Sequence, residues 1–205
     1  MRLTKRIPLG AGLGGGSSNA AFFLLGMKKL LRLKITSKEL FSIGKKLGAD
    51  VPFFLSDTGQ AVAWGTGDKL QKVTARARLG FLLLVTDQGL NTKKVYQALA
   101  WSGRPLSLTK ERRIAKILRS FLDRKRIREA AAIARNDLEI PAFRLMSSIP
   151  KAAAVLKGLG APFVLMSGSG ATVFAAFSGR KEVLDLSKRL KEVPFPFRKV
   201  ICHSF

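Results

Sequence analysis

The residues best suited to chemistry lie in a glycine-rich stretch near the start of this 205-residue chain. Five of the seven residues 10–16 are glycines, and Ser17 and Ser18 follow them directly. Glycines let backbone N–H groups turn inward and approach a ligand, because no Cβ stands in the way. We expect the two serines at the N-cap of an apolar helix over 20–31, and the N-terminus of a helix favours anions. The stretch therefore predicts a cradle for a chain of phosphates.

Other glycine motifs fit this stretch less well. The Gly-x-Gly-x-x-Gly pattern that starts at Gly10 belongs to dinucleotide-binding folds, but it needs a second strand ending in an acidic residue about 20 residues later. The segment in that place, 28–34, is basic. A P-loop needs Gly-Lys-Ser/Thr to close it, and this loop lacks that sequence. A flexible linker is not usually flanked by Ile-Pro on one side and by a serine pair opening an apolar helix on the other.

A single carboxylate follows the second expected helix. Asp50 stands between the end of that helix and the apolar, proline-containing segment 51–54. Most aspartates after Gly-Ala serve a turn or a cap, and this interpretation stays open here. The alternative is a general base that takes the proton of a substrate hydroxyl.

Two more candidates follow a strand expected over 81–85. A helix starting near Asn91 would place Thr92 and Tyr96 on one face, because they are four residues apart. Tyr96 is the only tyrosine in the chain. It is as well suited to packing on a helix face as to binding a ligand.

A late pair of apolar strands within 163–177 is hinged on a Ser-Gly-Ser-Gly sequence over 167–170. A plain hairpin needs only the glycines. Small residues also let backbone N–H groups face a phosphate, so Gly168, Ser169 and Gly170 are binding candidates.

Together these motifs resemble those of the GHMP small-molecule kinases. The family's ATP-phosphate loop is similar to Pro8-x-Gly10-Ala11-Gly12-Leu13-Gly14-Gly15-Gly16-Ser17-Ser18-Asn19-Ala20-Ala21. The family motif that carries the catalytic aspartate is similar to Gly48-Ala49-Asp50-Val51-Pro52-Phe53. The Gly-Gly-Gly-Ser-Ser-Asn-Ala-Ala form most resembles the branch whose substrate is a cytidine diphosphate-linked sugar alcohol.

The resemblance implies an ATP-dependent kinase that phosphorylates the 2-hydroxyl of a cytidine diphosphate-linked methylerythritol in non-mevalonate isoprenoid (terpenoid) biosynthesis. It implies that Asp50 is the catalytic base and that Ser17 or Ser18 orients Mg²⁺. Thr92 would hydrogen-bond the substrate, and Tyr96 would stack on its cytosine ring. The implied cofactor-binding residues are Pro8, Gly10, Ala11, Gly12, Leu13, Gly14, Gly15, Gly16, Ser17, Ser18 and Asn19.

Irregular alternation of helical and strand patterns predicts an α+β fold rather than a doubly wound sheet. The resemblance implies two domains. Residues 1–75 would form a partial N-terminal domain like that of ribosomal protein S5, with the loop and Asp50. Residues 76–205 would form a ferredoxin-like C-terminal domain. Among the expected helices, that after Thr36 starts with a capping box and stops at Gly48.

The remaining strands and helices are expected from periodicity and turn residues alone. They are strands over 1–7, near 59–64 and over 197–202, a helical region over 104–135, and helices over 149–158 and 180–193. Residues 136–139, Asn-Asp-Leu-Glu, resemble a family signature, for which we expect capping and packing rather than chemistry. His203, the only histidine, is expected in the tail.

The chain departs from the family in one respect. Family members begin with a longer segment of several strands, which holds a lysine that partners the aspartate, an aromatic-histidine pair and part of the adenine pocket. Here about one strand precedes the loop, so we expect a truncated, wrongly started or split form with an unpaired sheet edge. No residue matches that lysine, and Gln88 replaces the family's usual proline.

The composition contains 37 Lys and Arg against 13 Asp and Glu, a formal charge of +24. This excess suits nucleic acid, an anionic membrane or phosphorylated small molecules. The basic residues are scattered and not interleaved with aromatics, so we expect a small-molecule substrate and no nucleic-acid or membrane partner. One cysteine and no signal or membrane segment favour the cytoplasm. A GHMP kinase for another small alcohol and a non-catalytic nucleotide- or nucleic-acid-binding remnant stay open as alternatives, and the sequence indicates no oligomeric state.

Overall fold

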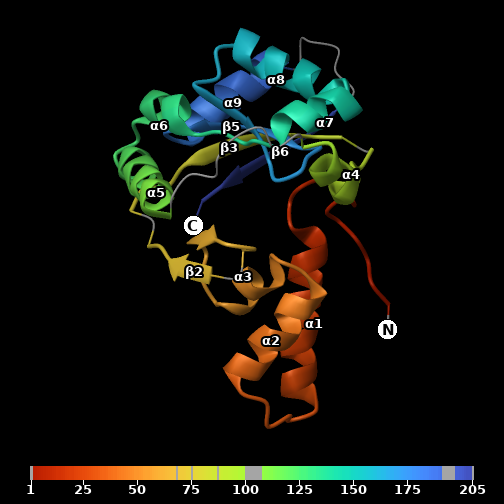
Figure 1. Cartoon of the computed structure of the whole chain (residues 1–205). Coiled ribbons are helices and arrows are strands. Elements are labelled where there is room, and N and C mark those ends of the chain that lie inside the picture. The colour runs from red at the N-terminus through yellow and green to blue at the C-terminus, as the bar shows by residue number, and fades with distance from the viewer. Residues whose placement is uncertain are drawn as a thin grey trace. The chain divides into compact units, whose positions relative to one another are not determined.

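The computed structural model describes residues 2–67, 69–74, 76–86, 88–99, 108–190 and 197–204. The chain divides into two compact units, one made of residues 1–13 and 76–205 and the other of residues 14–75. We describe each unit by itself. Figure 1 labels their helices and strands.

The smaller unit, 14–75, is built from three helices and a hairpin. The elements are α1 (Gly15–Leu30), α2 (Ser37–Leu47), α3 (Val51–Leu55), β1 (Ala61–Trp64) and β2 (Lys69–Lys72). Its core is formed by Ala21, Leu40, Val51 and Leu55, one or two from each helix. The two strands pair antiparallel, with Ala61 opposite Lys72. The sequence pattern predicted the first of these strands but not the second.

Helix α2 begins and ends as its sequence predicts. The hydroxyl of Thr36 accepts the backbone N–H of Glu39 at 3.2 Å, and a carboxylate oxygen of Glu39 accepts the backbone N–H of Thr36 at 2.8 Å. These hydrogen bonds from Thr36 lower the pKa of the Glu39 carboxyl. Gly48 caps the other end, so the expected capping box and stop are confirmed.

Two expectations about the start of this unit were wrong. Helix α1 begins at Gly15 rather than at residue 20, because Gly14 has a left-handed φ of 65° and no helix can continue backward through it. Ser17 and Ser18 therefore lie inside the first turn and are not the N-cap. The apolar residues of this helix also predict that it is buried, and this is wrong: Ala21 is its one buried residue, and the side chain of Phe22 is 64% exposed.

The larger unit is organised around one antiparallel sheet of four strands. The strands are β3 (Gly80–Val85), β4 (Phe163–Met166), β5 (Val173–Phe177) and β6 (Arg198–His203). Their order in the sheet is β4-β5-β3-β6. With helices between β3 and β4 and between β5 and β6, this is the β-α-β-β-α-β arrangement of a ferredoxin-like domain. The expected α+β class is confirmed.

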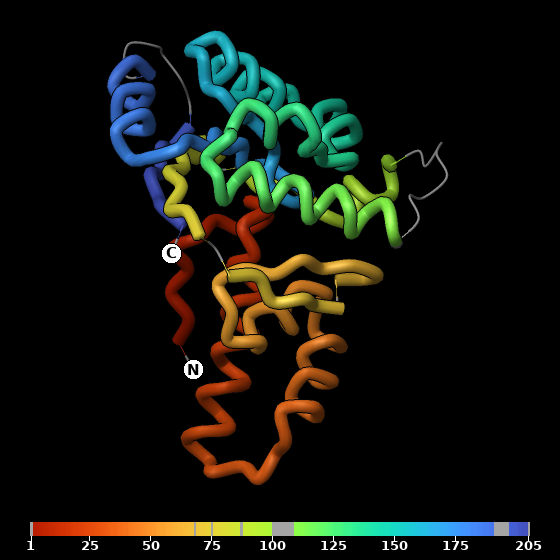
Figure 2. The backbone as a smooth tube through the Cα atoms, turned by 90° about the vertical axis from the view of Figure 1, so that its left-hand side faces the viewer, coloured from red at the N-terminus to blue at the C-terminus, as the bar shows by residue number. Residues whose placement is uncertain are grey.

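Helices of the larger unit cover both faces of this sheet. They are α4 (Thr92–Gln97), α5 (Leu108–Asp123), α6 (Ile127–Ile133), α7 (Glu139–Leu145), α8 (Ser148–Gly158) and α9 (Arg180–Arg189). Side chains alternate along the strands, so that Leu82 and Ala175 pack with Ile149 of α8 and Val183 of α9. Residues of the opposite face, such as Ala176, pack with Ile127 of α6. In Figures 1 and 2 the helices α7, α8 and α9 lie over one side of the sheet.

Several expected bounds in this unit change. The helical region expected over 104–135 consists of α5 and α6, separated near Lys125, whose φ is 57°, while residues 104–107 lie outside the described residues. Helix α9 ends at Arg189 instead of residue 193, and 191–196 are likewise outside the described part. Residues 2–7 form no strand. His203 belongs to β6, opposite Gly80, and not to a tail. The pairing of β6 with β3 therefore determines the position of His203, although it lies near the end of the chain.

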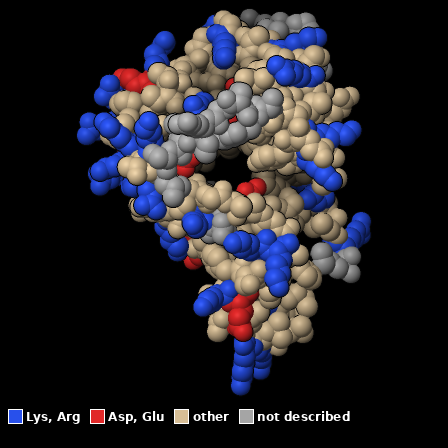
Figure 3. All heavy atoms as spheres, in the orientation of Figure 1, with Lys and Arg blue, Asp and Glu red and all other residues tan. Residues whose placement is uncertain are grey.

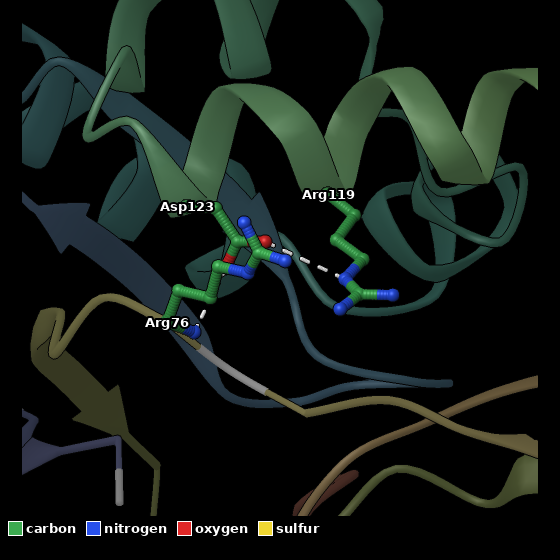
Figure 4. A network of polar contacts seen from close by, with 3 residues as sticks. All are labelled: Arg76, Arg119 and Asp123. Carbon is green, nitrogen blue, oxygen red and sulfur yellow. Dashed lines mark hydrogen bonds and ion pairs between the residues drawn. The ribbon is translucent and has the colours of Figure 1, made fainter.

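Asp123 at the end of α5 fixes the segment that leads into β3 (Figure 4). One carboxylate oxygen accepts the backbone N–H of Arg76 at 3.0 Å, and the other lies 3.5 Å from Nε of Arg119. The carboxylate thus replaces the strand or helix partner that the N–H of Arg76 would otherwise need.

The positive charge is spread widely over the surface. On the face shown in Figure 3, lysine and arginine side chains gather over the α5–α6 part of the larger unit. Only a few acidic side chains lie among them there. Within the described ranges, no helix has both the length and the apolar character that a bilayer crossing requires.

The capping box of α2 can be tested by Thr36→Ala. We expect a loss of about 1 kcal/mol in the free energy of unfolding, because one N–H of the first turn loses its acceptor. Urea unfolding at neutral pH measures it, with Ser37→Ala, the exposed neighbour, as the matched control. An equal effect of the two substitutions would contradict the assigned cap.

Candidate functional site

In the larger unit, the first half of the glycine loop, residues 10–12, forms hydrogen bonds to two turns through its backbone carbonyl groups. The carbonyl oxygen of Gly10 accepts the N–H of Leu90 at 3.0 Å and that of Ala171 at 3.1 Å. The carbonyl oxygen of Ala11 accepts the N–H of Thr172 at 3.2 Å. The hydroxyl of Ser167 donates to the carbonyl oxygen of Gly12 at 2.8 Å. Segments about 80 and 160 residues apart in the chain thus meet at residues 10–12.

This docking depends on glycine at two positions. Gly10 and Gly12 have left-handed φ values of 64° and 70°. A Cβ on Gly12 would collide with the carbonyl oxygen of Ser167, and one on Gly10 would lie 2.8 Å from the carbonyl oxygen of Leu90. The glycines therefore permit the close approach of backbones here, besides leaving room for a ligand.

The Ser-Gly-Ser-Gly sequence forms the turn between β4 and β5, as predicted. The N–H of Gly170 donates to the carbonyl oxygen of Ser167 at 2.9 Å, which closes the turn. The hydroxyls of Ser169 and Thr92 lie 2.9 Å apart and share a hydrogen bond. The structure therefore brings these two predicted substrate residues together. Among the described residues, the N–H groups of Gly168 and Ser169 have no acceptor.

Sequence reasoning gave Asn136 and Glu139 no part in this site. The Nδ2 of Asn136 donates to the carbonyl oxygens of Met166 at 2.9 Å and Gly168 at 2.7 Å. Glu139 Oε1 accepts the N–H of Met166 at 2.8 Å. The expected capping role is also present, because Asn136 Oδ1 accepts the N–H of Leu138 at 3.0 Å. The Asn-Asp-Leu-Glu sequence marks this segment as notable, but the sequence does not indicate which strand its side chains contact.

Helix α4 carries Tyr96, another predicted substrate residue, as well as Thr92. Asn91 caps this helix by accepting the N–H of Lys94 at 3.2 Å. Val95 is fully buried and packs α4 against the unit, whereas the Tyr96 side chain is 59% exposed. Val95 therefore takes the packing role that the sequence left open for Tyr96.

The second half of the loop begins helix α1 in the smaller unit. The first N–H groups of a helix have no intrahelical acceptor, and here they include those of Gly16 and Ser17. The hydroxyl of Ser18 donates to the carbonyl oxygen of Gly15 at 3.2 Å. The Ser17 hydroxyl makes no hydrogen bond to another described residue. The two serines thus differ in the freedom of their hydroxyls.

The Asp50 segment lies beside this helix start within the same unit. A Cβ built on Gly48 would be 3.9 Å from the Ser17 hydroxyl oxygen. Asp50 itself is exposed and occupies the N-cap position of α3, yet its carboxylate makes no capping hydrogen bond. The carboxylate is therefore available for a proton or a cation, although it stands in a cap position.

The donor set limits the kind of metal site. Within the described ranges, no three His, Cys, Asp or Glu side chains come together in a group that could hold a metal ion. A cation here would depend on one or two protein oxygens and on phosphate oxygens, which is how Mg²⁺ is usually bound beside a nucleotide.

A separate pocket of about 620 Å³ lies in the larger unit between α6 and α9. Basic and acidic side chains both line it, including Arg128, Arg189, Glu182 and Asp185. None of the predicted site residues is among its lining.

Residues 1–58 match the GHMP kinases N terminal domain, and residues 114–194 match the GHMP kinases C terminal domain. The chain is 43% identical over 175 residues to a 4-diphosphocytidyl-2-C-methyl-D-erythritol kinase of Syntrophus aciditrophicus, covering 85% of this chain and 59% of that protein. It is 40% identical to the kinase of the same name in Pelobacter propionicus, covering 87% and 60%. The chain thus spans about 60% of the length of these curated relatives.

A solved structure is similar as well. The crystal structure of a 4-(cytidine 5'-diphospho)-2C-methyl-D-erythritol kinase matches with a TM-score of 0.75 and 32% identity. The match covers 97% of this chain and 68% of that one.

Two glycines of the loop provide a matched pair of substitutions. We expect Gly12→Ala to cost at least about 2 kcal/mol of unfolding free energy, because the new Cβ meets backbone and φ is positive. Gly16→Ala should be neutral or stabilising by up to about 1 kcal/mol, since open space surrounds this helical position. Chemical denaturation of both variants measures the difference. Equal destabilisation would contradict the docking at Gly12.

Proposed function

Since the chain belongs to the GHMP kinase family, we propose that it transfers the γ-phosphate of ATP to the 2-hydroxyl of 4-diphosphocytidyl-2-C-methyl-D-erythritol. The supporting observation is that relatives 40–43% identical over most of the chain are named as kinases of this compound. The reaction belongs to non-mevalonate isoprenoid biosynthesis. The site residues, taken one by one, are consistent with this reaction.

The ATP phosphates bind along the loop from Pro8 to Asn19. The exposed N–H groups at the start of α1 and the helix dipole favour negative charge there. Gly14 and Gly16 carry no side chain that would hold a phosphate away from the backbone. Within the larger unit, the N–H groups of Gly168 and Ser169 are donors that an anion can occupy.

Mg²⁺ is held chiefly by phosphate and water oxygens, with few protein ligands. This fits a site in which one exposed carboxylate and the hydroxyl of Ser17 are the available ligands. Ser17 is the better protein ligand of the serine pair, because the Ser18 hydroxyl already donates to a helix carbonyl. The ion neutralises charge on the phosphates during transfer.

Asp50 accepts the proton of the attacking hydroxyl. Phosphoryl transfer needs positioning and charge neutralisation more than covalent chemistry, and one carboxylate is enough for the proton. The absence of a capping hydrogen bond leaves both its oxygens able to accept. The segment that leads into Asp50 lies beside the start of α1, since a Cβ on Gly48 would be 3.9 Å from the Ser17 hydroxyl oxygen, and this supports a role for Asp50 near bound phosphate.

The substrate is recognised from α4 and the β4–β5 turn. Thr92 already shares a hydrogen bond with Ser169, so one substrate hydroxyl or phosphate oxygen could meet both side chains. The exposed ring of Tyr96 lies one helical turn further along, available to stack on cytosine. The domain division at 1–75 and 76–205 and a cytoplasmic location remain predictions with this function.

The function is tested with purified full chain, Mg²⁺, [γ-³²P]ATP and 4-diphosphocytidyl-2-C-methyl-D-erythritol. We expect labelled phosphate on this substrate and none on homoserine or mevalonate. Transfer to either of those instead would assign another small alcohol. ATP binding without transfer to any acceptor would indicate the non-catalytic alternative, and ATP binding is therefore measured in parallel by calorimetry.

Asp50→Asn should lower the rate of transfer by about 10²- to 10⁴-fold, because the general base is lost. ATP affinity should stay within about threefold of the parent, a change of less than 1 kcal/mol. Asp57→Asn is the matched control, an exposed acid in the same unit whose left-handed φ of 49° asparagine tolerates. An Asp50→Asn variant with undiminished transfer would remove the base assignment.

Ser17→Ala and Ser18→Ala separate the two hydroxyls. We expect Ser17→Ala to raise the Mg²⁺ concentration needed for half-maximal ATP binding by about tenfold, as loss of one ligand to a charged group would. Ser18→Ala should change it by less than about twofold, because its hydroxyl serves the helix. Calorimetric titrations at several Mg²⁺ concentrations give the comparison. The reverse order would assign the ion to Ser18.

A further inference from the structure

The segment 136–139 meets the last residue of β4 and the turn that follows it. Asn136 donates to the carbonyl oxygens of Met166 and Gly168, and Glu139 accepts the N–H of Met166. These contacts bridge about 30 residues of chain. They reach the turn from the side opposite to β5.

The position of β4 in the sheet explains why such contacts are needed. β4 is an edge strand whose one neighbour is β5. The N–H of Ser167 donates to Thr172 of the hairpin, so the N–H and C=O of Met166 point outward, away from β5. Met166 is 1% exposed, and unpaired polar groups there would be costly. Glu139 and Asn136 supply the missing partners.

The bond to Gly168 has a different consequence. Carbonyl and N–H of one peptide unit point in opposite directions, because the unit is planar and trans. Holding the Gly168 oxygen on Asn136 therefore turns the N–H of Ser169 away from Asn136. That N–H has no acceptor among the described residues.

We propose that Asn136 is a positioning residue that orients the Gly168–Ser169 peptide, so that the Ser169 N–H is presented to the transferred phosphate. Glu139 supports it by holding Met166. This inference rests on the proposed kinase function, since it assigns the phosphate as the ligand. It extends that function to a side chain that does not touch the nucleotide.

The test uses Asn136→Asp in the full chain. The two side chains have the same shape, but the carboxylate has no donor for the two carbonyl oxygens and repels them. We expect affinity for Mg²⁺–ATP to fall about tenfold, as loss of one hydrogen bond to a charged group would, while that for Mg²⁺–ADP stays within about twofold. Asp137→Asn, the exposed neighbour paired with Arg135, should leave both unchanged.

Glu139→Gln keeps an oxygen for the Met166 N–H, so it should bind both nucleotides like the parent, whereas Glu139→Ala should resemble Asn136→Asp. A merely structural role would weaken ATP and ADP alike, and this result would overturn the proposal. Unchanged ATP affinity in Asn136→Asp would overturn it as well.

A second readout does not depend on nucleotide. In the free chain, Asn136→Asp should shift the ¹⁵N–¹H resonance of Ser169 and accelerate its amide exchange, while amides of β3 stay as in the parent. An unchanged Ser169 amide contradicts the positioning role even if no nucleotide binds. Absence of ATP binding in the parent chain would instead count against the proposed function.

Discussion

The contact between the backbone of residues 10–12 and two distant turns is the constraint on which the larger unit's site depends. Four hydrogen bonds, three of them between main-chain groups, tie this segment to Leu90 and to the β4–β5 turn. Main-chain contact at this distance excludes a Cβ on Gly10 and Gly12. The glycine content of the loop thus has a packing cause, besides the ligand-binding role that we propose for it.

A second theme is the satisfaction of backbone groups by side chains from distant segments. Asn136 and Glu139 do this for the edge strand β4, and Asp123 does it for Arg76 before β3. Each bonds backbone groups that the sheet and the helices leave without a partner. Among the described residues, the Thr172 hydroxyl is the one buried side-chain polar atom without a partner.

The net positive charge of the chain attracts anions over long distances. A formal charge of +24 surrounds the chain with a positive potential, which favours the approach of anions, including the proposed ATP and cytidine diphosphate-linked substrate. Such a field is indifferent to the identity of the anion. In the proposed function, selectivity therefore comes from short-range contacts, for which the Thr92–Ser169 pair and the exposed Tyr96 ring are the candidates.

The sequence by itself determined the features that depend on local chemistry. The capping box at Thr36, the stop at Gly48, the cap at Asn91 and the turn over 167–170 all follow from residues within a few positions of one another. The α+β class and the family resemblance also came from linear patterns. Local patterns misplaced the start of α1, because five nearby glycines leave the last left-handed residue undefined.

Only the tertiary structure decided which distant groups meet. It docked residues 10–12 of the loop on the β4–β5 turn, paired Thr92 with Ser169, and gave Asn136 two carbonyl oxygens 30 and 32 residues away. These outcomes depend on where a backbone group is left unpaired after the sheet and helices have formed, and no local pattern records that.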